Sequence, residues 1–286
     1  MKILFTDLDD TLLNSDKNIS KHTYSALIKM LSQGNKLVLA SGRPVSSILE
    51  VKEKLNLPDE NVYITAFNGA LLYDCKAGKV LSEERVDLKL AQELYDKATA
   101  AGFHIHTYDE NNNIISNHDD KELAYYRRHI CGEAKITDRL ADVMEKGPFK
   151  LLAISFDILD GDDKKQVNGG DAVSHGLDKF KKDFLVTELG SNFSCVFSHP
   201  TYLEFFSSNA GKGKGLIKLC DVLGIPVENS IAAGDAENDL SMIEAAGTGV
   251  CMSNGAPMLK EHADYITTND QNHDGIAEVI ERFILR

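Results

Sequence analysis

A strand–helix rhythm at both ends of the chain, broken in the middle, is the feature that most constrains the fold. Short apolar runs at residues 2–8, 36–40 and 62–67 alternate with segments of helical periodicity. The same rhythm returns after residue 211, with a predicted helix at 213–223 and a predicted strand, SIAAG, at 230–234. Such repeats form parallel sheets with helices on both faces. We therefore expect a doubly wound α/β fold made from both ends of the chain.

The middle of the chain has a different pattern. Runs such as HIHTY and YLEFF alternate polar and apolar residues, which is typical of an antiparallel sheet with one solvated face. We therefore expect a core formed by residues 1–82 and 209–286, with an α+β domain inserted at 83–208. The polar, glycine-rich stretch 160–170 predicts an exposed loop.

Composition narrows the classes of function. The 286 residues carry a formal net charge of −13, which argues against nucleic-acid binding, because phosphate backbones attract clustered Lys and Arg. An anionic ligand must therefore find a local positive site. No stretch is long enough to cross a membrane, and the start lacks the apolar region of a signal peptide. We expect a cytoplasmic protein, either a monomer or a small homo-oligomer.

Three carboxylates follow the first predicted strand in the motif DLDDT, residues 7–11. Asp7 and Asp9 are two residues apart, so on an extended chain their side chains point the same way. In this architecture ligands bind at the carboxyl edge of the sheet. Two carboxylates held there indicate a divalent cation, an acid/base pair, or both. The alternative is a solvated acidic turn that ends the strand.

A second acidic motif, GDAEND at residues 234–239, also follows a predicted strand. Asp235 could cap the next helix, and Asn238 and Asp239 would return to the same helix face. An acid-rich cap alone does not explain a matching cluster at the end of another strand. The two clusters need a counter-charge, and Mg²⁺ prefers carboxylate oxygens together with water and phosphate.

Two further motifs suit phosphate. Ser41-Gly42-Arg43 follows the strand KLVLA and combines a hydroxyl, a small residue and a cation at a strand–helix junction. The second motif is the loop GKGKG, in which Lys212 could act as a point charge, although the loop lacks the GxxxxGK[ST] pattern. The alternatives are an ordinary helix cap and a flexible turn.

Together the four motifs resemble those of the haloacid dehalogenase (HAD) superfamily, and within it the Cof-type phosphatases of subfamily IIB, which carry a large α/β cap. The resemblance covers the whole chain through DLDDT, SGR, Lys212 and GDAEND in that order. It implies a Mg²⁺-dependent phosphatase that hydrolyses small phosphorylated metabolites, most of all sugar phosphates, through an aspartyl-phosphate.

The resemblance also implies roles for particular residues. Asp7 would be the nucleophile, and Asp9 the general acid and base. Mg²⁺ would be held by Asp7, Asp235, Asp239 and the backbone carbonyl of Asp9. The implied phosphate- and substrate-binding residues are Ser41, Gly42, Arg43, Lys212 and Asn238. Specificity would come from the inserted domain.

Some assignments stay open. The family's commonest motif has glycine where this chain has Asp10, and we expect Thr11 to bond locally to backbone. Arg43 could meet a second anionic group on the substrate or form a salt bridge. Asn68 could line the same cleft or simply form a hairpin turn. Two other functions remain: a phosphotransferase or phosphomutase that uses the same aspartyl-phosphate, and a non-catalytic sensor of a phosphorylated ligand.

Overall fold

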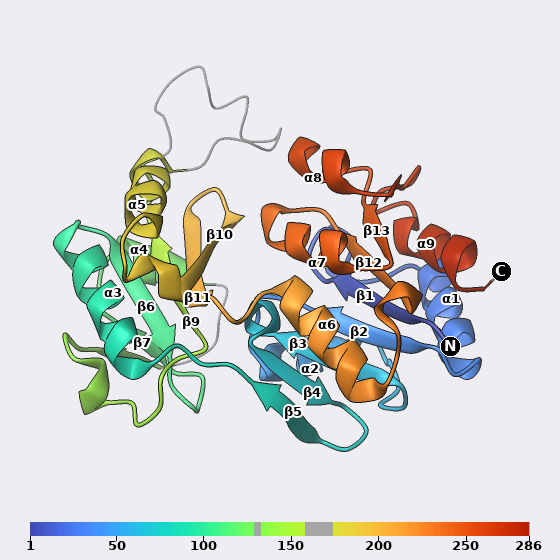
Figure 1. The fold of residues 1–286 in the computed structure, drawn as a ribbon, viewed down its shortest axis with the longest axis horizontal. Helices are drawn as coiled ribbons and strands as arrows, with labels where there is room; N and C mark the ends of the chain where they lie inside the picture. The colour runs from blue at the N-terminus through green and yellow to red at the C-terminus, as the bar shows by residue number, and fades with distance from the viewer. Residues whose placement is uncertain (129–132, 158–173, 286) are drawn as a thin grey trace. The chain divides into compact units, whose positions relative to one another are not determined.

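The computed structural model describes residues 1–128, 133–157 and 174–285, so the loop predicted at 160–170 lies outside the described residues. The chain divides into two compact units, one of residues 1–83 and 210–286 and one of residues 84–209. In Figure 1 the first unit carries both ends of the colour range, blue and red, and the second carries the middle. The boundaries expected from the sequence lie one residue from these.

An eight-stranded sheet forms the centre of the first unit, in the order β14-β13-β12-β1-β2-β3-β4-β5 within the described residues. The strands from β14 to β3 pair in parallel, whereas the pairings of β3 with β4 and of β4 with β5 are antiparallel. The strand bounds are β1 Ile3–Asp7, β2 Lys36–Ala40, β3 Val62–Ala66, β4 Leu71–Asp74, β5 Lys79–Glu83, β12 Ser230–Gly234, β13 Thr248–Cys251 and β14 Tyr265–Ile266.

Helices cover both faces of this sheet, which explains why its central strands β1 and β12 are buried along their whole length. On one face α6, α7 and α8 pack a core against β1, β2 and β12. Elsewhere α1 packs against α9 and β2, and α2 packs against β3. The helix bounds are α1 Lys21–Ser32, α2 Val45–Lys54, α6 Lys212–Leu223, α7 Leu240–Ala245, α8 Pro257–His262 and α9 Gly275–Phe283.

The second unit has a six-stranded sheet, in the order β10-β11-β9-β6-β7-β8 within the described residues. Its pairings are antiparallel except for β7 with β8. The elements are α3 Leu88–Ala100, β6 His104–Tyr108, β7 Ile114–Ser116, α4 Lys121–Tyr126, β8 Ala134–Ile136, β9 Lys150–Ile154, α5 His175–Leu185, β10 Phe193–His199 and β11 Tyr202–Ser207. The predicted fold class, a doubly wound α/β core with an inserted α+β domain, is confirmed.

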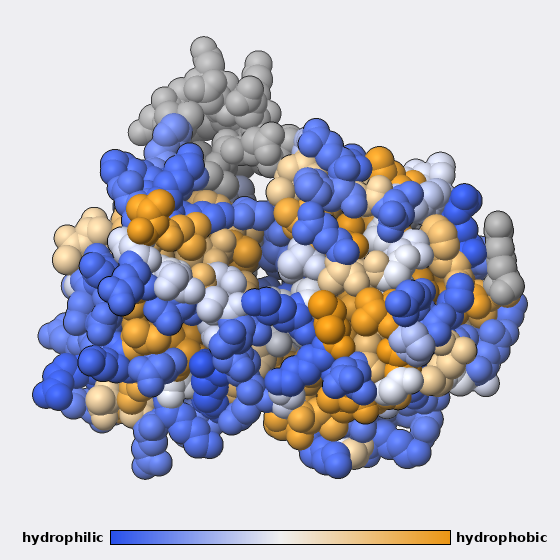
Figure 2. Space-filling model, viewed as in Figure 1, coloured by the Kyte–Doolittle hydropathy of each residue, from blue (hydrophilic) through white to orange (hydrophobic). Residues whose placement is uncertain are grey.

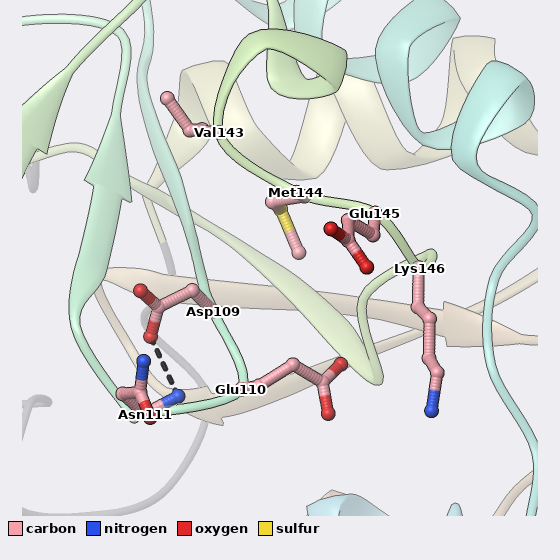
Figure 3. A pocket seen from close by; sticks show the side chains of 7 residues that line it. All are labelled: Asp109, Glu110, Asn111, Val143, Met144, Glu145 and Lys146. Atoms are coloured by element: carbon pink, nitrogen blue, oxygen red, sulfur yellow. Dashed lines mark hydrogen bonds between the residues drawn. The ribbon is translucent and has the colours of Figure 1, made fainter.

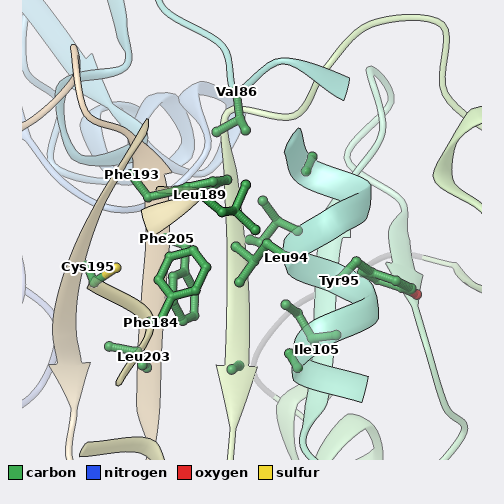
Figure 4. Close-up of a cluster of buried hydrophobic side chains, with 14 of the residues drawn as sticks. Val86, Leu94, Tyr95, Ile105, Phe184, Leu189, Phe193, Cys195, Leu203 and Phe205 are labelled. Carbon is green, nitrogen blue, oxygen red and sulfur yellow. The ribbon is translucent and has the colours of Figure 1, made fainter. Parts of the chain in front are cut away.

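A separate apolar core stabilises the second unit (Figure 4). Leu94 of α3 and Phe184 of α5 pack toward Ile105, Leu203 and Phe205, which lie on strands of the sheet. Burial of side chains of this size contributes about 1.5–3 kcal/mol each, before entropy is counted. The inserted segment therefore has a hydrophobic core of its own.

Hydrophilic side chains cover much of the face shown in Figure 2, with apolar areas scattered between them. Among the described residues, none of the helices has the length and apolar character needed to span a membrane.

Candidate active site

The motifs meet at the carboxyl edge of the parallel strands, as the topology requires. Strand β1 ends at Asp7, and its neighbours in the sheet are β2, which precedes Ser41, and β12, which precedes Asp235. In register, Asp7 lies beside Ala40 of β2, and Thr6 beside Ala233 of β12. Residues more than 200 positions apart are therefore neighbours because their strands are adjacent and parallel.

Lys212 joins two of the carboxylates. Its Nζ donates to Asp7 Oδ1 at 2.6 Å and to Asp239 Oδ1 at 2.5 Å. Its side chain is 0% exposed, so both ion pairs are shielded from solvent. The carboxylates raise the pKa of Lys212 well above its usual range, against the opposing effect of burial. Lys212 is the first residue of α6, which aims this cation into the acidic cluster.

Asp239 is fully buried, and both of its carboxylate oxygens accept hydrogen bonds. Its Oδ2 accepts hydrogen bonds from the backbone N–H groups of Asp235, at 2.9 Å, and Ala236, at 3.1 Å. The expectation that Asp235 caps the following helix is wrong, because Asp239 closes the turn by reaching back. This arrangement leaves the carboxylate of Asp235 facing the cluster.

Thr11 holds that carboxylate. Its Oγ1 donates to Asp235 Oδ1 at 2.7 Å. The expectation that the Thr11 side chain bonds locally to backbone is therefore wrong. A single sequence offers no signal for this bond, because it spans 224 positions and depends on the β1–β12 pairing.

Asp7, Asp235 and Asp239 could share a cation. Each offers a carboxylate oxygen, and these three oxygens lie within 4.8 Å of one another. Burial raises the pKa of Asp7 to about 7, the neighbouring acids adding to the rise and Lys212 opposing it. Burial, together with the charges of Asp239 and Asp7, raises the pKa of Asp235 to about 8. The single positive charge of Lys212 does not balance the three carboxyl groups. Three carboxylate oxygens at this spacing are a donor set that fits Mg²⁺.

Asp9 points to a different set of partners. Arg43 donates to Asp9 from Nε at 2.9 Å and from Nη2 at 2.7 Å, and Lys17 Nζ donates to Asp9 Oδ1 at 2.9 Å. Burial opposes ionisation of Asp9, but the two cations outweigh it and lower its pKa. The sequence indicated Asp9 and Arg43 but missed Lys17, which lies in the loop after β1 and belongs to no motif.

The SGR loop lies beside this pair. Ser41 is buried, and its Oγ accepts the backbone N–H of Arg43 at 3.2 Å. The hydroxyl proton of Ser41 is therefore directed away from that contact, as a phosphate-binding group requires. Gly42 is half-buried between them. Asn238, also half-buried, donates from Nδ2 to Asn68 Oδ1 at 3.5 Å.

The backbone at Asp10 suits the glycine that the resemblance leads us to expect at this position. Asp10 has φ 58°, in the left-handed region that glycine adopts readily and that Asp tolerates better than most residues. Its side chain is exposed, and its carbonyl accepts a hydrogen bond from Asn254 Nδ2 at 2.8 Å. The substitution thus preserves the turn.

The second unit contains a pocket of about 330 Å³ between the β6–β7 loop and residues 143–146 (Figure 3). In the close-up, Asp109 is turned toward Asn111, and Glu110 and Lys146 extend from opposite sides. Asp109 accepts backbone N–H groups, and Glu110 pairs with Arg85 at 2.7 Å. None of its lining residues belongs to the four motifs, so this pocket carries none of the chemistry indicated by the sequence.

Comparison with models of known protein families shows which family this chain belongs to. A family model described as haloacid dehalogenase-like hydrolase matches residues 4–280. The chain belongs to this family. The resemblance drawn from the motifs is confirmed, and the chain is a hydrolase of the haloacid dehalogenase-like class.

Relatives extend over the full length. “Putative phosphatase YxeH” of Bacillus subtilis is 29% identical over 284 residues, which is 99% of this chain and 98% of the relative. YwtE of the same organism, named a 5-amino-6-(5-phospho-D-ribitylamino)uracil phosphatase, is 25% identical, covering 99% and 98%. A crystal structure of a haloacid dehalogenase-like hydrolase from Bacteroides thetaiotaomicron superposes with a TM-score of 0.78 at 30% identity, covering 98% of both chains.

Proposed function

We propose that this protein is a Mg²⁺-dependent phosphatase that hydrolyses small phosphomonoesters through an aspartyl-phosphate on Asp7. The observation that carries the proposal is the buried cluster of Asp7, Asp235 and Asp239 around Lys212, at the strand ends of a haloacid dehalogenase-like hydrolase. Burial of so much like charge costs stability, which a purely structural role would not explain.

In the first step a carboxylate oxygen of Asp7 attacks phosphorus, and the bond from phosphorus to the ester oxygen breaks. The leaving oxygen takes a proton from Asp9 and departs as an alcohol. Lys212 and Ser41 bind the phosphoryl oxygens, on which charge is spread in the transition state. Asn238, Gly42 and Arg43 would bind the substrate beside these two residues.

In the second step water attacks the aspartyl-phosphate, and Asp9, now a carboxylate, accepts a proton from that water. Inorganic phosphate leaves and Asp7 is restored. Arg43 and Lys17 stabilise the ionised form of Asp9, which is the form that serves this step. To donate a proton in the first step, Asp9 has to give up at least one of these contacts.

Asp7, Asp235 and Asp239 would hold Mg²⁺ with the backbone carbonyl of Asp9. The ion would neutralise charge on the phosphoryl group and keep Asp7 ionised. Without a cation, the pKa of Asp7 at about 7 leaves a substantial fraction of this nucleophile protonated at neutral pH.

For the substrate we propose a small phosphorylated metabolite, most of all a sugar phosphate. The relative YwtE is named for a phosphorylated ribityl compound, and the net charge of −13 disfavours long polyanions. We further propose that residues 84–209 supply the groups that select the leaving alcohol, because the motif residues all lie in the other unit.

The test is phosphate release from a panel of sugar phosphates and other monoesters, with Mg²⁺ or EDTA. We expect turnover that needs Mg²⁺ and falls at least a thousandfold in Asp7→Asn, which keeps the size of the side chain but is no nucleophile. Transfer of phosphate to a sugar acceptor without release would favour a phosphotransferase or mutase. Ligand-dependent stabilisation with no turnover by folded protein would refute the proposal in favour of a sensor.

A further inference from the structure

The turn after β3 has an unusual backbone. Phe67, Asn68 and Gly69 have φ values of 51°, 55° and 87°, so three consecutive residues are in the left-handed region. For Phe this conformation is a true outlier, and for L-residues it costs about 1–2 kcal/mol each. Such conformations persist only where the surroundings enforce them, and they concentrate at functional sites.

Two motif loops enforce this turn. The N–H of Phe67 donates to the carbonyl of Arg43 at 3.1 Å, and the N–H of Asn68 donates to the carbonyl of Ser41 at 3.0 Å. On the other side a Cβ added at Gly69 would lie 2.3 Å from the carbonyl oxygen of Gly211, which directly precedes Lys212. The turn therefore contacts both the loop that carries Ser41 and the start of α6.

The side chain of Asn68 is part of this contact. It is 1% exposed, and its Oδ1 accepts the amide of Asn238 at 3.5 Å. A residue chosen only for its backbone conformation can leave its side chain in solvent, as Asn56 does with φ 52°. A buried amide costs stability unless its polar atoms are satisfied, so Asn68 requires a reason beyond the turn.

We propose that Asn68 is a positioning residue for phosphoryl transfer: its carbonyl oxygen orients the amide of Asn238, and its strained turn sets Ser41 against Lys212. This inference rests on the phosphatase reaction proposed above. A misplacement of about 1 Å in such a site can cost about a hundredfold in rate. The turn would thus connect all the phosphate-binding loops of the first unit.

Asn68→Gly separates the two roles, because glycine keeps the backbone and removes the side chain. Relief of strain at position 68 offsets the lost hydrogen bond, so we expect a melting temperature close to that of the wild type. We expect kcat/KM for the best monoester to fall at least tenfold. The matched control is Asn56→Gly, an exposed left-handed position at the end of α2, which should leave kcat/KM unchanged.

A double-mutant cycle with Asn238→Ala tests the coupling. If Asn68 acts through Asn238, the double variant should be no slower than the slower single variant. Losses that multiply would overturn the proposal, whatever happens to the melting temperature, and so would wild-type kcat/KM in Asn68→Gly. Either result leaves the phosphatase function standing. An inactive wild type would instead refute the function, and with it the role of Asn68.

Discussion

Replacement of Lys212 by Met tests the electrostatic reasoning about the site. Lys212 is the cation that contacts both Asp7 and Asp239, at 2.6 and 2.5 Å, and its side chain is excluded from solvent. Met has a similar length but no charge. The variant therefore leaves buried carboxylates without their counter-charge and changes side-chain volume little.

The loss of stability follows from this geometry. Removal of one partner from a buried ion pair costs about 3–5 kcal/mol. We expect a loss of about 3–5 kcal/mol at pH 7. Because loss of Lys212 raises the pKa of Asp7 above its value of about 7, the folded variant binds more protons than the folded wild type at and above pH 7, so the deficit should shrink as the pH falls from about 8.5 to 7.

The assay is urea unfolding followed by far-ultraviolet circular dichroism, because the chain contains no Trp. The matched control is Lys150→Met in the second unit, where Lys150 forms a buried pair with Glu204 at 2.9 Å. Both variants should lose stability. Mg²⁺ should stabilise both variants by RT ln(1 + [Mg²⁺]/Kd), or about 2.7 kcal/mol at one hundred times Kd, but the gain should be larger in Lys212→Met, where the uncompensated carboxylates give the lower Kd.

Three results would contradict this reasoning. A loss below about 1 kcal/mol would mean that the carboxylates are already neutral or hydrated in the folded protein. A deficit independent of pH would exclude the uncompensated acids as its cause. A gain from Mg²⁺ that is no larger in Lys212→Met than in Lys150→Met would show that the removed lysine does not oppose cation binding at the acidic cluster.

Two further predictions concern stability. Gly69→Ala should lower the free energy of unfolding in urea by about 2 kcal/mol more than Gly34→Ala. Both glycines have φ above 80°, but of the two only Gly69 lies where a new Cβ would meet backbone atoms. Equal losses in the two variants would refute this close approach. Burial lowers the pKa of His106 well below 6.5, so the unfolded chain binds more protons than the folded one below pH 6.5. Stability of the second unit should therefore fall by up to about 1.4 kcal/mol per pH unit from 6.5 to 5.5. In His106→Gln that acid-dependent loss should be smaller, and an unchanged slope would assign it to other groups.

Local patterns predicted much of this structure. Strand β2 lies at residues 36–40 as expected, and helix α6 begins one residue before the predicted start. Ser20 caps α1, accepting the N–H of Thr23 at 2.9 Å. These features depend on hydrophobic periodicity and on hydrogen bonds between near neighbours in the chain, which a single sequence displays directly.

Features that depend on distant neighbours were not predictable in this way. The bond from Thr11 to Asp235 and the contact of Lys17 with Asp9 follow from how loops meet in space. Asp239, in place of Asp235, closes the turn with one carboxylate oxygen, while its other oxygen accepts a hydrogen bond from the buried and distant Lys212. The sequence predicted that the motif residues lie at one edge of the sheet, but only the structure shows which of their side chains contact one another.

The split first unit has a consequence for synthesis of the protein. Strand β1 pairs with β12, yet the whole second unit, residues 84–209, lies between them in the chain. At about 5–20 residues per second a ribosome needs roughly 8–30 seconds to proceed from β5 to β12. During that interval one edge of β1 lacks its partner strand while the inserted unit, with its own core, can already fold. Nascent chains are therefore most prone to aggregation in this window, and chaperones that shield exposed strand edges would act there.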